Sequence, residues 1–220
     1  LKSIPAQIDV PMTVVAGHFD HRIAGTLLGY ELLSDKVKAK SRLIVGGWDH
    51  DFKTTPRLEG IKNDKQVSIE DDRFNWLRTL LVEERVPEHE VKVYAIGADK
   101  WLDLEEWPSA GSQTVTYYLA SEDAGLDTKP EKKKGEWSYM YDPKNPVISV
   151  GGETLFSSNS RKGSILQQPV GYRDDILFFL SEPLEEPMMI SGPLTAKVWF
   201  SSDCEDTAVT VKVSEERADG

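Results

Sequence analysis

The sequence contains a single cysteine, Cys204, and no run of 18 consecutive apolar residues. One cysteine excludes an intrachain disulfide framework, and we expect a half-buried strand residue at this position rather than a reactive thiol. Without a long apolar run, no membrane-spanning helix is predicted. Residues 1–5 lack the basic stretch and apolar core of a signal peptide, which leaves the compartment unknown: the cytoplasm is favoured, and secretion is not excluded.

Basic residues are few, with 26 Lys and Arg against 37 Asp and Glu, giving a formal net charge of −11. Such a surface repels phosphate backbones and anionic lipids, so neither nucleic acid nor a membrane is an expected partner. The 220 residues include 39% apolar and 29% charged residues, which is typical of a globular protein. This length favours two modest domains, each with its own core.

The first part of the chain has the pattern of a parallel α/β sheet. Residues 10–16 form a short apolar run before Gly17, and residues 42–45 form a second one before Gly46. Between the two runs, apolar residues recur at helical spacing, namely Ile23, Leu27, Leu28, Tyr30 and Leu33. Strand, helix and strand in this order predict a βαβ unit.

A second helix is predicted from Ser68, which can act as the N-cap, to Pro87, which ends it. Three acidic residues fall in its first turn, and Phe74, Leu77 and Leu81 form one apolar stripe. We expect this stripe to pack on the sheet.

After Pro87 the apolar pattern changes to period two, which predicts antiparallel strands. The expected strands cover residues 91–96, 114–119, 175–180, 188–191, 194–201 and 207–213, with Gly, Pro, Asn and Asp clusters between them. Many short strands without helices indicate a β-sandwich or jelly roll. The predicted fold is therefore an α/β domain over residues 1–88, read as the C-terminal part of an α/β-hydrolase sheet, followed by an all-β jelly-roll sandwich over residues 89–220.

Polar motifs follow both predicted parallel strands, where α/β sheets place their active sites. G-H-F-D ends at Asp20, and G-G-W-D-H ends at His50. In the α/β-hydrolase triad the acid and then the histidine follow the serine along the chain. Asp20 and His50, about one helix and one strand apart, have this order. The carboxylate would fix the imidazole tautomer, and the imidazole would take the serine proton. If so, the carboxylate and the ring must lie within about 2.6–3.2 Å.

Two other interpretations apply to these residues. Asp20 precedes a helix and could be its cap, and a single loop histidine is often only a surface residue. His18, His21, Asp20 and Asp49 could together suggest a metal site, but no Cys or His-x-x-x-His spacing supports one. We therefore expect no metal and no cofactor.

The serine nucleophile is not found. No Gly-x-Ser-x-Gly occurs, and Gly163-Ser164 lies beyond the histidine, inside the predicted sandwich. We therefore expect the chain to be truncated at its front. It is also expected to stop short after Gly220, since a turn there would lack its following strand. Proteolysis or deliberate design would each explain this.

The two motifs resemble those of the family of cocaine esterase, α-amino acid ester hydrolases and X-prolyl dipeptidyl peptidases. G-H-F-D resembles the family's Gly-Trp-x-Asp around the triad acid, and G-G-W-D-H resembles its Gly-Pro-Trp-x-His around the triad histidine. His18 and Gly47 replace the tryptophan and the proline. Later blocks are similar to the family's jelly-roll domain, including Y-A-I-G-A-D-K-W from Tyr94, R-D-D-I-L from Arg173 and S-S-D from Ser201.

The resemblance implies a serine hydrolase that cleaves esters or amides through an acyl-enzyme, with Asp20 and His50 as its catalytic acid and base. It implies that Leu155 and Phe156, after Gly151-Gly152, lie near the acyl pocket and bind substrate; plain strand packing is the alternative. The expected partner is a small ester or amide or a short peptide, X-Pro peptides included, and a homo-oligomer is left open. This chain alone is expected to be inactive.

Two further functions stay open from the sequence. A jelly roll can also bind carbohydrates or other ligands without catalysis, since sandwiches support many functions. The chain could also be a complementing subunit whose nucleophile lies on a separate polypeptide.

Overall fold

In this computed structural model, the described residues are 7–52, 69–132, 135–153 and 163–217. The chain divides into two compact units. Leu1–Gln113 and Tyr141–Gln167 form the first, and Thr114–Met140 and Gln168–Gly220 form the second. None of the described helices is long and apolar enough to cross a membrane.

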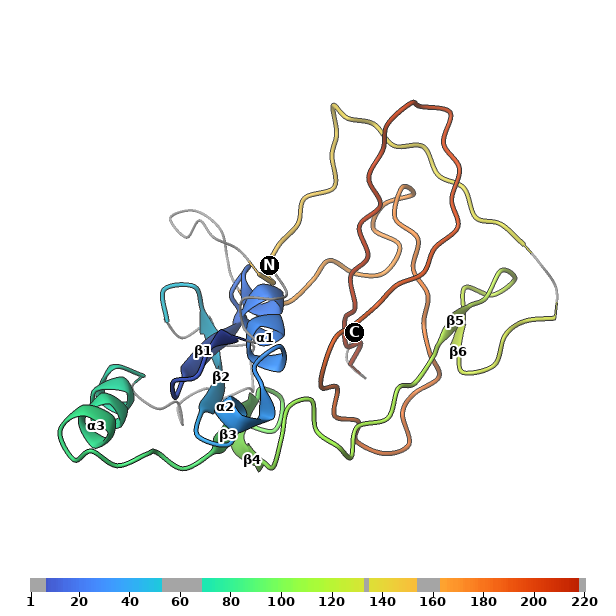
Figure 1. Cartoon of the computed structure of the whole chain (residues 1–220). Helices are drawn as coiled ribbons and strands as arrows, with labels where there is room; N and C mark the ends of the chain where they lie inside the picture. Colours follow the sequence, from blue (N-terminus) through green and yellow to red (C-terminus); the bar gives the residue numbers. More distant parts are fainter. Residues whose placement is uncertain (1–6, 53–68, 133–134, 154–162, 218–220) are drawn as a thin grey trace. The chain divides into compact units, whose positions relative to one another are not determined.

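The first unit contains a four-stranded sheet in the order β1-β2-β3-β4 (Figure 1). The strands are β1 (Thr13–Phe19), β2 (Arg42–Asp49), β3 (Glu90–Ala95) and β4 (Lys100–Leu104). β1, β2 and β3 are parallel, and β4 is antiparallel to β3. The predicted parallel pairing of the first two strands is thus present. Both strands run further than the apolar runs indicated, because their terminal glycines continue the ladder: Gly17 is opposite Gly46.

Two helices connect β1 to β2, namely α1 (Ile23–Glu31) and α2 (Asp35–Lys38). Tyr30, Leu33 and Val37 from this connection are buried together with Leu43 and Val45 of β2. These contacts bear out the helical spacing read from the sequence. Leu28 is the exception, since its side chain is exposed.

The opposite face of β2 carries Arg42, Ile44 and Trp48, and α3 (Ile69–Leu81) lies against its beginning. A helix is present where one was predicted, but it ends at Leu81 and not at Pro87, and its packing also differs. Phe74, Leu77 and Leu81 are 72%, 41% and 69% exposed, so the predicted apolar stripe does not contact the sheet. Instead α3 faces the sheet with Asp72 and Trp76, because the Arg42 guanidinium binds the Asp72 carboxylate and lies over the Trp76 ring.

The sheet continues past the boundary predicted at residue 88. β3 begins at Glu90 and pairs with β2, although its alternating pattern was assigned to the sandwich. Val91 and Val93 belong to the same buried cluster as Leu43, while Lys92 binds Glu90 on the other face. A parallel strand with one polar face therefore has the same pattern as an antiparallel strand. The division into domains at residue 88 stays a prediction.

The second unit contains the two-stranded antiparallel sheet of β5 (Tyr118–Leu119) and β6 (Leu126–Asp127). Of the strands expected beyond residue 96, only Tyr118–Leu119 lies in a described strand. Gly125 also forms an isolated parallel bridge with Leu180. The described residues at 188–213 have apolar side chains at the predicted alternation, but Val209, Val211 and Val213 are exposed. An alternating apolar pattern shows that a segment suits a half-buried strand, but it does not show which strand it pairs with.

Candidate active site

The candidate site lies where β1 and β2 end side by side. Phe19 is opposite Asp49, so the next residues along both strands are Asp20 and His50. The register shifts between Gly17 and Phe19: these residues are two positions apart, while their partners Gly46 and Asp49 are three apart. The extra residue in β2 is a bulge, a device that redirects side chains at strand ends.

Asp20 is held in a turn between β1 and α1. Its backbone N–H donates to the Gly17 carbonyl at 3.1 Å, and its own carbonyl accepts from the Ile23 N–H at 2.9 Å. Its Oδ1 accepts from the Arg22 backbone N–H at 2.9 Å. The carboxylate is therefore fixed by a turn in the chain that leads into the helix, but it is not the cap of α1, because Arg22 is the N-cap residue and the helix has no side-chain cap hydrogen bond.

The same carboxylate oxygen meets His50. The distance from Asp20 Oδ1 to His50 Nδ1 is 3.1 Å, within the range expected for the predicted pair. The Asp20 and His50 side chains are 15% and 31% exposed. A hydrogen on Nδ1 would be donated to Asp20, which leaves Nε2 with the lone pair that a general base needs. Asp20 therefore pairs with His50 and does not cap α1, whose N-cap residue is Arg22.

The chain after β2 forms a turn that carries His50. The Asp49 Oδ1 atom accepts from the Asp51 N–H at 2.9 Å, and the Phe52 N–H donates to the Asp49 carbonyl at 3.1 Å. Asp49 is only 5% exposed. Its side chain therefore closes the turn behind His50, and the metal interpretation that included it is not supported by this geometry.

Trp48 packs against both strands near their ends, next to Gly17 of β1 and Gly46 of β2. It is fully buried against Ile44, and Val15 and Trp101 pack around this pair. A Cβ atom at Gly46 would lie 2.2 Å from the Trp48 ring, and one at Gly17 would lie 2.3 Å from the Trp48 carbonyl oxygen. Glycine is needed at both positions because the indole occupies the space of a side chain.

His18 points away from the pair. It is half-buried, and its Nε2 donates to the Tyr94 carbonyl at 2.9 Å. Burial lowers the pKa of His18, and the hydrogen bond to Tyr94 acts in the opposite direction. The neutral ring thus ties β1 to β3 and does not join the side chains at the strand ends.

His21 does join them, although nothing in the sequence pattern distinguishes it from His18. Its ring lies edge-on to that of His50 with 4.8 Å between centroids, and its Nδ1 is 3.4 Å from Asp20 Oδ1. Glu153 lies in the same electrostatic environment. Partial desolvation raises the pKa of the Glu153 carboxyl, the Asp20 charge raises it further, and His21 lowers it. Glu153 lies 133 positions beyond Asp20 in the sequence, so only the fold brings it close enough to be affected by the Asp20 charge.

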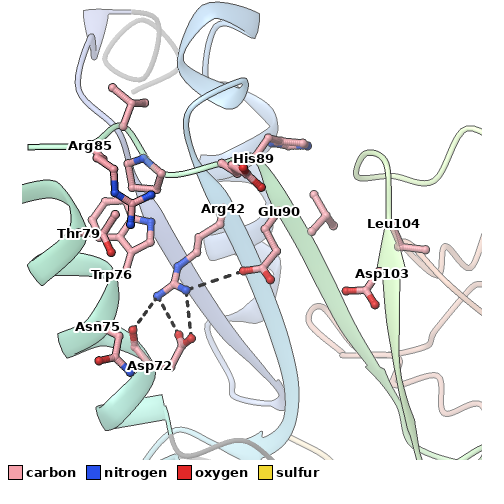
Figure 2. A pocket seen from close by; sticks show the side chains of 14 residues that line it. Arg42, Asp72, Asn75, Trp76, Thr79, Arg85, His89, Glu90, Asp103 and Leu104 are labelled. Carbon is pink, nitrogen blue, oxygen red and sulfur yellow. Dashed lines mark hydrogen bonds and ion pairs between the residues drawn. The ribbon is translucent and has the colours of Figure 1, made fainter. Parts of the chain in front are cut away.

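An open cavity of about 830 Å³ lies at the other end of the sheet, where β2 and β3 begin. Figure 2 shows Arg42 in this cavity, with contacts to Asp72 of α3 and Glu90 of β3. Its Nη2 is 2.7 Å from Asp72 Oδ2, its Nη1 is 3.8 Å from Glu90 Oε2, and its Nε donates to Thr13 Oγ1 at 2.9 Å. Arg42, Asp72 and Glu90 are thus paired with one another, and we assign the cavity no role in catalysis.

The remaining predicted site residues, Leu155 and Phe156, lie outside the described residues. A few residues before them, Gly152 pairs with Gly163. Gly151 has a φ of +75°, and a Cβ there would lie 2.6 Å from the Gly163 carbonyl oxygen. Their substrate-binding role stays a prediction.

Comparison with known proteins adds two findings. Residues 84–220 match the family described as the X-Pro dipeptidyl-peptidase C-terminal non-catalytic domain. The chain is also similar to cocaine esterase of Rhodococcus sp. (strain MB1 Bresler), with 27% identity over 237 aligned positions that cover 96% of this chain. The chain spans 39% of the length of that relative. Asp20 and His50 precede the part that matches the non-catalytic domain.

Proposed function

Because this chain belongs to the family of cocaine esterase and X-Pro dipeptidyl peptidases, with residues 84–220 as its C-terminal non-catalytic domain, we propose that it is part of a serine hydrolase. In this proposal Asp20 and His50 are the triad acid and base, at the end of an α/β-hydrolase sheet. The serine lies outside these 220 residues. The single observation that supports the proposal best is the 3.1 Å contact between Asp20 Oδ1 and His50 Nδ1 at neighbouring strand ends.

The chemistry follows from this contact. Asp20 accepts the Nδ1 proton of His50, which keeps the lone pair on Nε2. Nε2 takes the proton of the serine hydroxyl as the serine attacks the ester or amide carbonyl, and His50 then returns this proton to the leaving group. The Arg22 N–H on Asp20 Oδ1 stabilises the ionised carboxylate that the imidazolium needs.

The proposed substrate is a small ester or amide, or a short peptide that contains an X-Pro bond. The names of the family and of the relative support this range without selecting within it. We further propose that the region after the sheet folds as a jelly roll. The alternating apolar residues at 209, 211 and 213 support a strand there.

The test compares this chain with a longer protein that also contains the upstream sequence. The longer protein should give an acyl-enzyme burst with p-nitrophenyl acetate, whereas the 220-residue chain should give none. Asp20→Asn and His50→Ala in the longer protein should each lower kcat by roughly 10³- to 10⁴-fold, as in other triads. Asp103→Asn is the matched control, because this carboxylate is 79% exposed and lies on β4. Unchanged turnover in either dyad variant would remove the assignment.

A binding module without catalysis would behave differently. Trp199 and Phe200 are strongly exposed on the second unit, which is the one observation that favours this alternative. Titration of the chain with oligosaccharides distinguishes the two functions. Saturable heat that Trp199→Ala abolishes would support the binding module, and no heat would count against it.

A further inference from the structure

We propose that Asp20, His21 and His50 form a binding site for a divalent transition-metal ion, with Zn²⁺ as the ion that suits these ligands best. The site is a property of the folded chain and does not depend on the proposed hydrolase activity. Its effect on catalysis, described below, does rest on that activity.

Two of the separations between the ligand atoms, those from Asp20 to each histidine, fit the coordination of zinc. One carboxylate oxygen of Asp20 lies 3.1 Å from His50 Nδ1 and 3.4 Å from His21 Nδ1. Two ligands about 2.0–2.1 Å from a tetrahedral zinc ion are separated by about 3.3 Å. The three ligand atoms all lie within 4.8 Å of one another. Two imidazoles and a carboxylate, with water in the fourth position, form a common ligand set for zinc.

His21 is also suitably placed to bind. Its Nδ1 atom is buried and has no hydrogen-bond partner among the described residues, while 28% of its side chain remains exposed. A buried nitrogen aimed at a carboxylate without a normal hydrogen bond can gain a partner if a cation enters. The exposed remainder of the side chain gives the ion a route from solvent.

Charge acts in both directions around the site. The carboxylate of Glu153 lies close enough to sense Asp20 and adds negative potential that attracts a cation. The Arg22 guanidinium opposes this, since its Nε donates to His21 Nε2 at 3.2 Å. This contact is on the surface, so Arg22 can leave it at little cost. His21 and His50 then each keep one proton, which moves from Nδ1 to Nε2 as Nδ1 binds the metal.

The proton shift has a chemical consequence. Once Nε2 of His50 carries the hydrogen, it has no lone pair to accept the serine proton. The metal also occupies Asp20, which can no longer hold the base in its active tautomer. In a working hydrolase, zinc would therefore be a reversible inhibitor that acts on the triad and not on the serine.

The site is tested by zinc titration of the 220-residue chain, with a fluorescent zinc indicator as competitor. All proteins carry Cys204→Ser, which removes the only thiol. We expect one equivalent of Zn²⁺ to bind and Mg²⁺, which prefers oxygen ligands, to give no saturable binding at the same concentrations. His21→Asn should weaken zinc binding by about 100-fold or more, since even losing a ligand's supporting hydrogen bond costs up to that much. His89→Asn, the matched control, should leave it unchanged.

An absence of one-equivalent binding, or equal weakening by His21→Asn and His89→Asn, would overturn the proposal. Circular dichroism of each variant shows whether it is folded. A second measurement needs no variant: X-ray absorption of the zinc complex should show nitrogen and oxygen neighbours at about 2.0–2.1 Å with scattering from two imidazoles. Scattering from one imidazole or none would also overturn the site. A failed hydrolase assay would not, because neither readout involves turnover.

Discussion

The two compact units of this chain differ in where their apolar side chains lie. In the first, β2 is buried along its whole length, and Trp48, Tyr30 and Tyr94 are fully buried. In the second, Ala120 is the only buried apolar residue among those that the structure describes, and Trp199 is 82% exposed.

This difference follows from how far along the chain each partner lies. β1 and β2 are joined by one short helical connection, so a local segment brings the strands together and covers one face. In the second unit, Gly125 and Leu180, which form a bridge, are more than fifty residues apart in the sequence. Pairing of such distant residues loses more chain entropy before stabilising contacts can form. A parallel βαβ unit is therefore largely specified locally, whereas a sandwich needs distant strands to meet.

The largest effect on the first unit should come from Gly46→Ala. Its new Cβ would lie 2.2 Å from a Trp48 ring that has no room to move. We expect a loss of about 3 kcal/mol in the free energy of unfolding, at the upper end of the range for overpacked cores. Urea unfolding followed by tryptophan fluorescence measures it.

Gly25→Ala is the control for this change. A Cβ at Gly25 in α1 meets nothing within 4 Å, so the variant should be stabilised by about 0.5–1 kcal/mol through the helix preference of alanine. If both variants unfold at the same urea concentration, the space between the two strand ends is not filled as described.

Arg42→Met tests the clamp between α3 and the sheet. The Arg42 side chain is 7% exposed, but its partners Asp72 and Glu90 are 25% and 33% exposed and keep part of their hydration. We therefore expect a loss of about 2 kcal/mol, below the range of roughly 3–5 kcal/mol for fully buried pairs. Arg78→Met on the outer side of α3, where the side chain is 70% exposed, should cost under about 0.5 kcal/mol. Equal losses in thermal or urea unfolding would show that α3 is not held by this contact.

His18 should make the first unit sensitive to acid. Its pKa is lowered in the fold by burial, so the unfolded chain binds the proton at higher pH than the folded chain does. Stability is then complete above the ordinary pKa near 6.5 and falls as the pH drops below it, by at most about 1.4 kcal/mol per pH unit. His18→Gln can still donate to Tyr94 and does not titrate.

The measurement is the free energy of unfolding between pH 7.5 and pH 5.5 in a buffer with EDTA, for both proteins. The curve of His18→Gln should be flatter in this window, because the other histidines contribute equally to both. Parallel curves would mean that His18 is protonated as readily in the folded state as in the unfolded chain.

The smallest effect should come from the second unit. Trp137 donates from Nε1 to the Ala120 carbonyl at 3.1 Å, and its ring lies edge-on to Phe179 at 6.1 Å. Trp137→Phe keeps a ring and loses the hydrogen bond, so we expect a loss of about 1 kcal/mol or less. Trp199→Phe at an 82% exposed position should stay within about 0.5 kcal/mol of the parent. A loss of several kcal/mol in either variant would contradict the contrast between the units, since it would indicate a covered core around these tryptophans.

Much of the first sheet could be predicted because its signals are local. The helical spacing from Ile23 to Leu33 and the glycines after both apolar runs placed Asp20 and His50 at adjacent strand ends, where the structure has them. The orientation of α3 could not be predicted, because it depends on Arg42, a charged residue inside an otherwise apolar run. The pattern of apolar residues cannot predict an ion pair between residues that are distant in the sequence, such as Arg42 and Asp72.

The candidate site was predictable in its two principal residues and not in their surroundings. Order along the chain and position after strands were enough to select Asp20 and His50. His21 follows Asp20 directly in the sequence, but no motif marks it as part of the site. Glu153 belongs to a distant segment, and nothing in the sequence predicts that this segment lies near Asp20. The catalytic role of the pair and the role of Leu155 and Phe156 stay predictions.

The bulge in β2 gives this part of the chain an unusual response to insertions and deletions. Because side chains alternate between faces along a strand, one residue fewer between Gly46 and Asp49 would let the two strands pair without interruption. The repaired ladder would be more regular, but β2 would lose the local bend and twist that a bulge produces, so the chain would leave the sheet in another direction and carry His50 away from Asp20. A shortened chain could therefore keep its fold while losing the contact between Asp20 and His50. The bulge makes the ladder less regular, but it keeps these two side chains aligned.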